Sequence, residues 1–237
     1  MQIARAPRRC LAAMLVTVAL LAPSIASAQA CDPNTEARLD FLETRLEDGQ
    51  PRAKLWWGSW MAIFTIGVVA GVTQGTLHDD NGAQVNNFIT AGKAVLGMAD
   101  LTFRPHVARY GADRVRAIPK SSSANCTERL HLAEKTMETA AKEANMRWDW
   151  KRHVWSLTLN LAHGLVIAEA FKHDQSDGWT SFAVSEVSSE AFLWTHPTRA
   201  ANDWNDYHQQ FDGTRLSKLG EWHFAPHPGG IAIAYNF

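Results

Sequence analysis

The feature that most constrains this chain is an apolar stretch from Leu55 to Leu77, which contains no ionisable side chain. As an α-helix rising about 1.5 Å per residue, the stretch is long enough to cross a hydrocarbon layer of roughly 30 Å. Gly67, Gly71 and Gly75 recur at every fourth position, so one face of this helix lacks side chains and a second helix can pack closely against it. The pattern predicts a helix-packing surface and not a catalytic one.

The first thirty residues have the order of a secretory signal peptide. Arginines precede an apolar run, Leu11–Leu21, and small residues around Ala28 follow it. The run is too short to serve as a lasting membrane anchor. We therefore expect residues 1–30 to be a signal peptide, and the exported chain to begin near Gln29 or Cys31.

Two cysteines remain after this cleavage, Cys31 and Cys126. In an oxidising compartment an isolated pair forms a disulfide more often than a reactive site. A structural disulfide is the favoured interpretation, and two free thiols are the alternative.

Charge and motifs exclude several classes of function. The chain has 23 Lys and Arg against 24 Asp and Glu, and no basic stripe with interleaved aromatic residues, so nucleic acid is not an expected partner. The sequence contains no phosphate loop, nucleophile elbow, dinucleotide fingerprint or His-Glu-x-x-His helix. We therefore predict no catalytic residue, no metal ligand and no cofactor, and an enzyme is the less favoured class.

Residues 31–53 are predicted to form an amphipathic helix. Leu39, Leu42 and Leu46 recur at helical spacing among charged residues, and Gly49 and Pro51 are expected to end the helix.

Residues 54–199 are predicted to form an all-α, membrane-embedded domain of two helical hairpins, each preceded by an amphipathic helix. The expected helices are Leu55–Leu77, Gln84–Phe103, 125–146, His153–Phe171 and Trp179–Trp194. An exposed connection is expected at 104–124, with Asn125 as N-cap of the next helix. The interval from Trp60 to His78 equals that from Trp155 to His173. Either an internal duplication of the hairpin or a chance resemblance would explain this match.

Residues 200–237 are predicted to be a polar tail that ends in an extended segment. Ile231, Ile233, Tyr235 and Phe237 alternate with small or polar residues, as in the last strand of an outer-membrane barrel. The chain lacks the repeated alternating segments that a barrel needs. A single strand packed on the helices is therefore the preferred interpretation.

Membrane embedding has support and opposition in the sequence. If both hairpins span, both cysteines and most tryptophans lie at the same membrane face, where an aromatic belt is expected. The turns at the other face, however, have only Lys172 as a basic residue, which inverts the usual positive-inside bias. Mean hydropathy is also low, at −0.22. A soluble helical bundle with an apolar core is therefore the alternative.

Polar residues inside the apolar helices form the candidate site. Pairs on one helix face could converge if the helices pack together, and their members are Lys93, Asp100, Asn160, His163, Glu186 and Glu190. An internal polar network that fixes helix register is the leading interpretation, and a metal or proton site is the alternative. His223 and His227 have metal-like spacing, but Pro226 prevents the helix that would align them.

These features predict an exported, membrane-associated protein of the cell envelope with a structural or interaction role, packing through its Gly-x-x-x-Gly-x-x-x-Gly helix. The alternative is a small intramembrane protein that binds a ligand or ion, or acts as a carrier or enzyme, through the polar residues. Expected partners are membrane lipid, a second copy of the chain, or another envelope protein. The sequence does not distinguish the inner from the outer membrane.

Overall fold

The fold comes from a computed structural model that describes residues 31–170, 175–213, 222–227 and 230–235; the proposed signal peptide lies outside them. Helices dominate these residues, so the predicted all-α class is confirmed. The helices in chain order are α2 (Pro33–Leu77), α3 (Asn81–Phe103), η1 (Val107–Arg109), α4 (Gly111–Arg116), α5 (Ser123–Ala144), η2 (Asn145–Trp148), α6 (Trp150–Leu165), the π-helix η3 (Val166–Ala170), α7 (Gln175–Trp194) and α8 (Arg199–Phe211).

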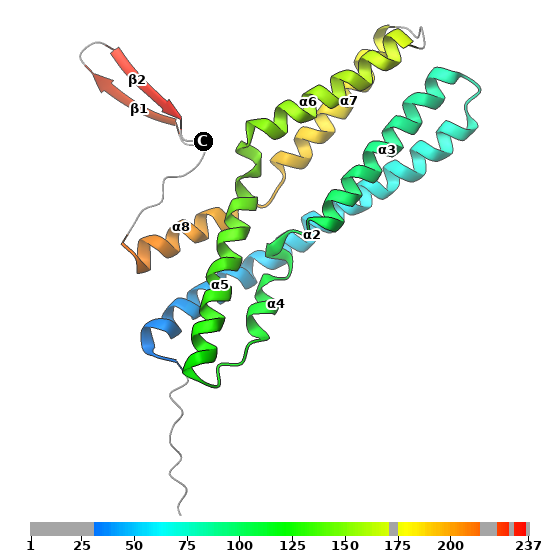
Figure 1. Cartoon of the computed structure of the whole chain (residues 1–237). Coiled ribbons are helices and arrows are strands. Elements are labelled where there is room, and N and C mark those ends of the chain that lie inside the picture. The colour runs from blue at the N-terminus through cyan, green and yellow to red at the C-terminus, as the bar shows by residue number, and fades with distance from the viewer. Residues whose placement is uncertain (1–30, 171–174, 214–221, 228–229, 236–237) are drawn as a thin grey trace, which may run out of the picture.

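The described helices form two parts (Figure 1). The head contains the first part of α2, up to residue 54, with η1, α4, α5, η2 and α8. The helix pairs extend away from the head in the same direction: residues 55–77 of α2 pack against α3, and α6 with η3 packs against α7. The long helix α2 therefore belongs to both parts.

Helix α2 does not end at Gly49 and Pro51, where the sequence pattern predicted a stop, but continues through both to Leu77. An internal proline removes one backbone hydrogen bond and crowds the preceding turn. Pro51 faces solvent, and the buried Leu46 and Ala53 hold the helix on either side of it. Tertiary packing therefore keeps one helix where local chemistry favours two.

A disulfide joins Cys31 to Cys126, as predicted, and links the start of α2 to the start of α5. Leu39, Leu42 and Met137 pack beside it in the core of the head. The N-cap of α5 is Ser122, whose hydroxyl accepts a hydrogen bond from the backbone N–H of Asn125 at 3.2 Å. The prediction of Asn125 as N-cap was therefore wrong, because a serine three residues earlier performs that role.

The segment 104–124, expected to be an exposed connection, contains two short helices, η1 and α4. Ala112 and Val115 of α4 are almost fully buried in the head core, and His106 is buried beside α5. Small apolar residues on one face of a six-residue helix give only a weak pattern. The basic residues around them led to the prediction of an exposed connection.

The region predicted as a polar tail begins with α8, which packs on α5 and α2. Tyr207 is only 1% exposed, and Arg38 donates a hydrogen bond to its hydroxyl at 2.6 Å. Further along, β1 (Trp222–His227) and β2 (Gly230–Tyr235) pair antiparallel, so the chain has a hairpin where a single strand was expected.

Candidate polar site between the helix pairs

The glycine face of α2 lies against α3. A Cβ atom placed on Gly71 would lie 2.7 Å from the backbone oxygen of Asn87, and one on Gly75 would lie 3.0 Å from the ring of Phe88. Gly67 approaches an alanine of α3 in the same way, at 3.2 Å. Any side chain at Gly71 would push the two helices apart.

The second pair uses glycines that the sequence analysis did not single out. A Cβ on Gly164 of α6 would lie 2.7 Å from the backbone oxygen of Gly178 on α7, and the reverse contact would be 2.6 Å. Gly178 was assigned to a turn because α7 was expected to start at Trp179; the helix begins four residues earlier, at Gln175.

Four of the six predicted polar residues meet between the helix pairs. The ammonium Nζ of Lys93 on α3 donates to Asn160 Oδ1 on α6 at 2.6 Å and lies 3.4 Å from His163 Nδ1. Asn160 Nδ2 in turn donates to Glu186 Oε2 on α7 at 2.7 Å. Asn160 is 1% exposed and therefore lies at the centre of this polar cluster.

Serine hydroxyls complete the cluster. Ser156 Oγ donates to Glu186 Oε2 at 3.1 Å, and Ser189 Oγ lies 3.1 Å from Asn160 Nδ2. His163 is 4% exposed, and its Nε2 has no hydrogen-bond partner among the described residues. One polar atom of the cluster is thus buried and unsatisfied, which is rare in folded proteins.

Asp100 and Glu190 lie outside the cluster. Asp100 pairs with Arg104 at 3.3 Å, one turn along α3 and near solvent. Glu190 accepts hydrogen bonds from His153 and from the indole of Trp194, both at 2.9 Å, close to the head. They share helix faces with the cluster residues but lie nearer the head.

A second concentration of buried polar groups lies where the helix pairs leave the head. The indoles of Trp56 and Trp60 both donate to the hydroxyl of Thr195, at 3.2 and 3.0 Å. The imidazoles of His106 and His196 contact each other beside Trp56, with ring centroids 4.5 Å apart and tilted planes. Each imidazole is almost fully buried and has one ring nitrogen without a partner among the described residues.

Burial explains the electrostatics of this second region. Burial, together with the neighbouring His106, Arg147 and Arg152, lowers the pKa of His196 to about 3. The sequence analysis missed both histidines, because each stands alone next to a proline in a segment without helical periodicity.

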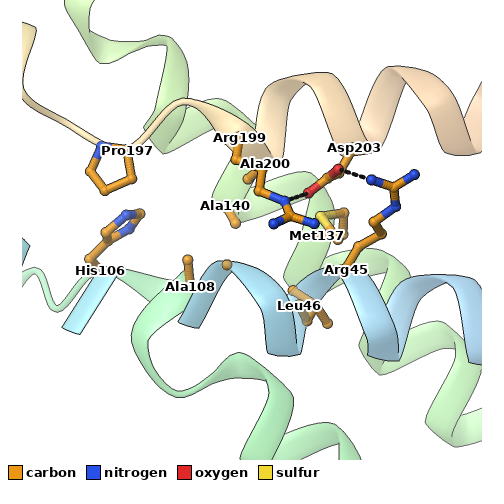
Figure 2. A pocket seen from close by; sticks show the side chains of 11 residues that line it. Arg45, Leu46, His106, Ala108, Met137, Ala140, Pro197, Arg199, Ala200 and Asp203 are labelled. Carbon is orange, nitrogen blue, oxygen red and sulfur yellow. Dashed lines mark hydrogen bonds and ion pairs between the residues drawn. The ribbon is translucent and has the colours of Figure 1, made fainter. Parts of the chain in front are cut away.

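A small pocket opens on the other side of His106 (Figure 2). Asp203 lies between Arg45 and Arg199, at 3.1 and 3.2 Å, and Ala108, Ala140 and Pro197 contribute to the wall. Burial raises the pKa of Asp203 although both arginines oppose that shift. The pocket encloses about 20 Å³, which is room for one water molecule and not for an organic substrate.

Metal-binding groups are not assembled in the part of the chain that the structure describes. No three His, Cys, Asp or Glu side chains there are placed to share an ion. His78 and Asp79 are exposed in the turn between α2 and α3. His173 and Asp174 lie outside the described residues, and so do the side chains of His223 and His227 on β1.

Comparisons with protein-family models, with curated proteins and with solved structures found no match to this chain.

Proposed function

We propose that this chain is a membrane-embedded helical protein of the cell envelope, with its head on the periplasmic side and a structural or interaction role. The observation that carries the proposal is the distribution of exposed apolar side chains. Every exposed large hydrophobic residue of the described chain lies on the helix pairs, and the head has none. Soluble monomers rarely expose apolar surface on this scale.

The exposure of apolar side chains on the individual helices supports contact with membrane lipid. Ile66, Val69 and Val72 of α2 are 44–66% exposed, and Leu96 of α3 and Val187 of α7 are 67% and 70% exposed. Of the described helices only α2 is long and apolar enough, by composition, to count as a candidate span, and only 17% of its apolar window is buried. A core helix of a soluble protein would be mostly buried.

The lengths of the helices also suit a bilayer. The helix α3 has 23 residues, about 34 Å, and α7 has 20, about 30 Å, against a hydrocarbon thickness of about 30 Å. Trp150, Trp155 and Trp194 are exposed at the end of the pairs nearest the head, where an interfacial aromatic belt would lie. The disulfide of the head fits an oxidising compartment.

Envelope fractionation with a carbonate wash tests this proposal. We expect untagged protein to stay in the pellet until detergent is added. A sharper test is Ile66→Lys, because a lysine at mid-bilayer costs about 2.5–3.5 kcal/mol, whereas an exposed lysine in water costs almost nothing. His131→Lys, at an exposed position on α5, is the matched control. Release of the wild type by carbonate, with Ile66→Lys as stable as the control, would instead establish a soluble bundle.

A second candidate function is binding of an ion, a proton or a small ligand within the helix pairs. The unsatisfied Nε2 of His163, inside a cluster that also contains Lys93 and Glu186, favours it. Glu186→Gln keeps the shape of the side chain and removes its charge; Glu190→Gln, outside the cluster, is the control. If the cluster only fixes helix register, Glu186→Gln lowers stability and leaves every binding signal unchanged. Loss of a bound ion from a folded Glu186→Gln protein would favour the binding function.

A further inference from the structure

Basic side chains of the described head are mostly neutralised by carboxylates. Arg129 forms a buried, two-pronged pair with Glu43, and Arg45 and Arg199 share Asp203. Further ion pairs involve Arg38, Arg116, Lys120 and Lys142. Against this background, basic residues without an acidic partner are informative.

Four arginines have no ion pair with any described carboxylate: Arg52, Arg109, Arg114 and Arg147. Arg114 lies in α4 over the ring of Tyr110, and the other three lie where the helix pairs join the head. Arg52 precedes the apolar part of α2, Arg109 lies in η1 just after α3, and Arg147 lies in η2 just before α6. Three separate chain segments therefore bring an unneutralised guanidinium to the same level of the molecule. Lys151, exposed in the first turn of α6, also has no ion pair with a described carboxylate.

Two of these guanidinium groups are incompletely hydrogen-bonded. The Nε of Arg147 and one Nη of Arg109 are buried from solvent and have no partner among the described residues. Arg147 Nη2 donates to the backbone oxygen of His196, at 3.3 Å. Burial and the nearby charge of Arg52 both lower the pKa of Arg147. Two like charges close together, one of them partly desolvated, are costly unless an anion joins them.

The aromatic neighbours indicate what kind of anion this is. The guanidinium of Arg109 lies 3.9 Å from the ring centre of Trp57, and that of Arg147 lies 5.8 Å from the ring of Trp194. Trp150 and Trp155 are exposed beside them. Tryptophan and arginine together at one end of apolar helices are typical of the headgroup layer of a membrane.

We propose that Arg52, Arg109 and Arg147, with Lys151, form a cationic belt that binds the phosphates of anionic lipids in the leaflet nearest the head. A guanidinium presents a fork of N–H donors that matches a phosphate. The belt rests on the proposed membrane embedding. It also gives a role to the basic residues that invert the positive-inside bias, since they contact lipid in the leaflet facing the head.

Reconstitution into vesicles tests the belt separately from embedding. The full mature chain is inserted into phosphatidylcholine vesicles that contain traces of spin-labelled phosphatidylglycerol or spin-labelled phosphatidylcholine. The fraction of each label that is immobilised by protein gives the lipid preference. We expect the wild type to prefer phosphatidylglycerol, and Arg52→Gln/Arg147→Gln to lower that preference by roughly tenfold. Lys135→Gln/Lys142→Gln, with the same charge change on α5 of the head, should keep it.

The outcomes separate the two proposals. Failure to enter either kind of vesicle in a carbonate-resistant form overturns the embedding itself. Stable insertion with equal immobilisation of both lipids overturns the belt alone. If inorganic phosphate stabilises the detergent-solubilised wild type but not the double variant, and no lipid preference exists, the arginines bind a free anion and the lipid assignment is wrong. Arg52→Lys/Arg147→Lys distinguishes charge from fork geometry: full retention of the preference means charge alone suffices.

Discussion

His196 is a residue whose chemistry depends on its position between the two parts of the molecule. It is 3% exposed and contacts the rings of His106 and Trp56, and its Nδ1 has no partner among the described residues. Burial, with the charge of nearby basic groups, lowers its pKa to about 3. The imidazole is therefore held neutral in the folded chain at pH values where an unfolded chain would protonate it.

Stability is predicted to fall with acidification because of His196. Its folded pKa lies below the ordinary value near 6.5, so the unfolded chain binds the proton more readily and stability is lost as pH falls from about 6.5 toward 3. The loss from this group is about 1.4 kcal/mol by pH 5.5. Denaturant unfolding of the detergent-solubilised protein at pH 7.5 and 5.5, followed by tryptophan fluorescence, measures it.

His196→Gln should flatten the pH dependence, whereas His131→Gln, at an exposed position on α5, should leave it as in the wild type. Burial raises the pKa of Asp203, so this group stabilises the folded chain as pH falls and does not account for a loss of stability. An identical slope in the His196→Gln protein would contradict the assignment.

The polar residues show how far residue-level reasoning extends. Helical spacing places Asn160 and His163 on one face of α6, and it suggested that Lys93 pairs with Glu186 or Glu190. In the structure Asn160 links Lys93 to Glu186. It also grouped Asp100 and Glu190 with them, because i to i+7 and i to i+4 spacing gives a shared face. The spacing does not show at which position along the helix a residue contacts the neighbouring helix. That position depends on how the helices cross, which is determined by the close contacts at Gly71 and Gly164 and cannot be derived from the spacing.

At the scale of elements, the close contact of α2 with α3 gives a direct test. In Gly71→Ala the added methyl group would lie 2.7 Å from the backbone oxygen of Asn87 and 3.0 Å from the Cβ of Ala91, so the helices must shift. Overpacking of this kind costs about 1–3 kcal/mol. We expect a lower thermal midpoint in detergent and faster proteolysis between α2 and α3.

Gly92→Ala is the matched control for this substitution. Gly92 is also a helical glycine of this pair, but nothing lies within 4 Å of a Cβ built there. Alanine should therefore be neutral or stabilising, by up to about 1 kcal/mol of helix propensity. Equal destabilisation by both changes would mean that α2 and α3 do not pack as described.

Element boundaries failed where a remote partner decides the structure. Pro51 ends a helix in most contexts, yet Leu46 and Ala53 on either side are buried in the head, and α2 continues. The helix α8 looked like a polar tail because its buried residues include Asp203 and Asn205. Arg199, one turn earlier in α8, and Arg45 both pair with Asp203, and Arg45 is separated from it by 158 residues, so the sequence near Asp203 carries no signal of that contact.

At the scale of the whole molecule, the two parts are held together by different interactions. The head has a disulfide, an apolar core around Leu39 and Leu42, and ion pairs to most of its arginines. The helix pairs have close glycine contacts, one polar cluster and an exposed apolar surface. The head therefore has an apolar core and a charged surface, as a water-soluble domain does. The helix pairs carry apolar side chains on their surface, which favours a nonpolar environment.

This division predicts that loss of the disulfide loosens the head and spares the helix pairs. The crosslink spans a sequence separation of 95 residues, and closing a loop of that length stabilises the folded chain by up to about 4–5 kcal/mol in the chain-entropy model. In Cys31→Ser/Cys126→Ser, proteases should cut first near residues 117–122, between α4 and α5, while α3 and α7 and residues 55–77 and 150–170 stay protected in detergent or lipid. Mass spectrometry of the fragments locates the cuts. Cuts in both parts at equal rates would mean that the molecule unfolds as one unit, because the head and the pairs share α2 without a boundary between them.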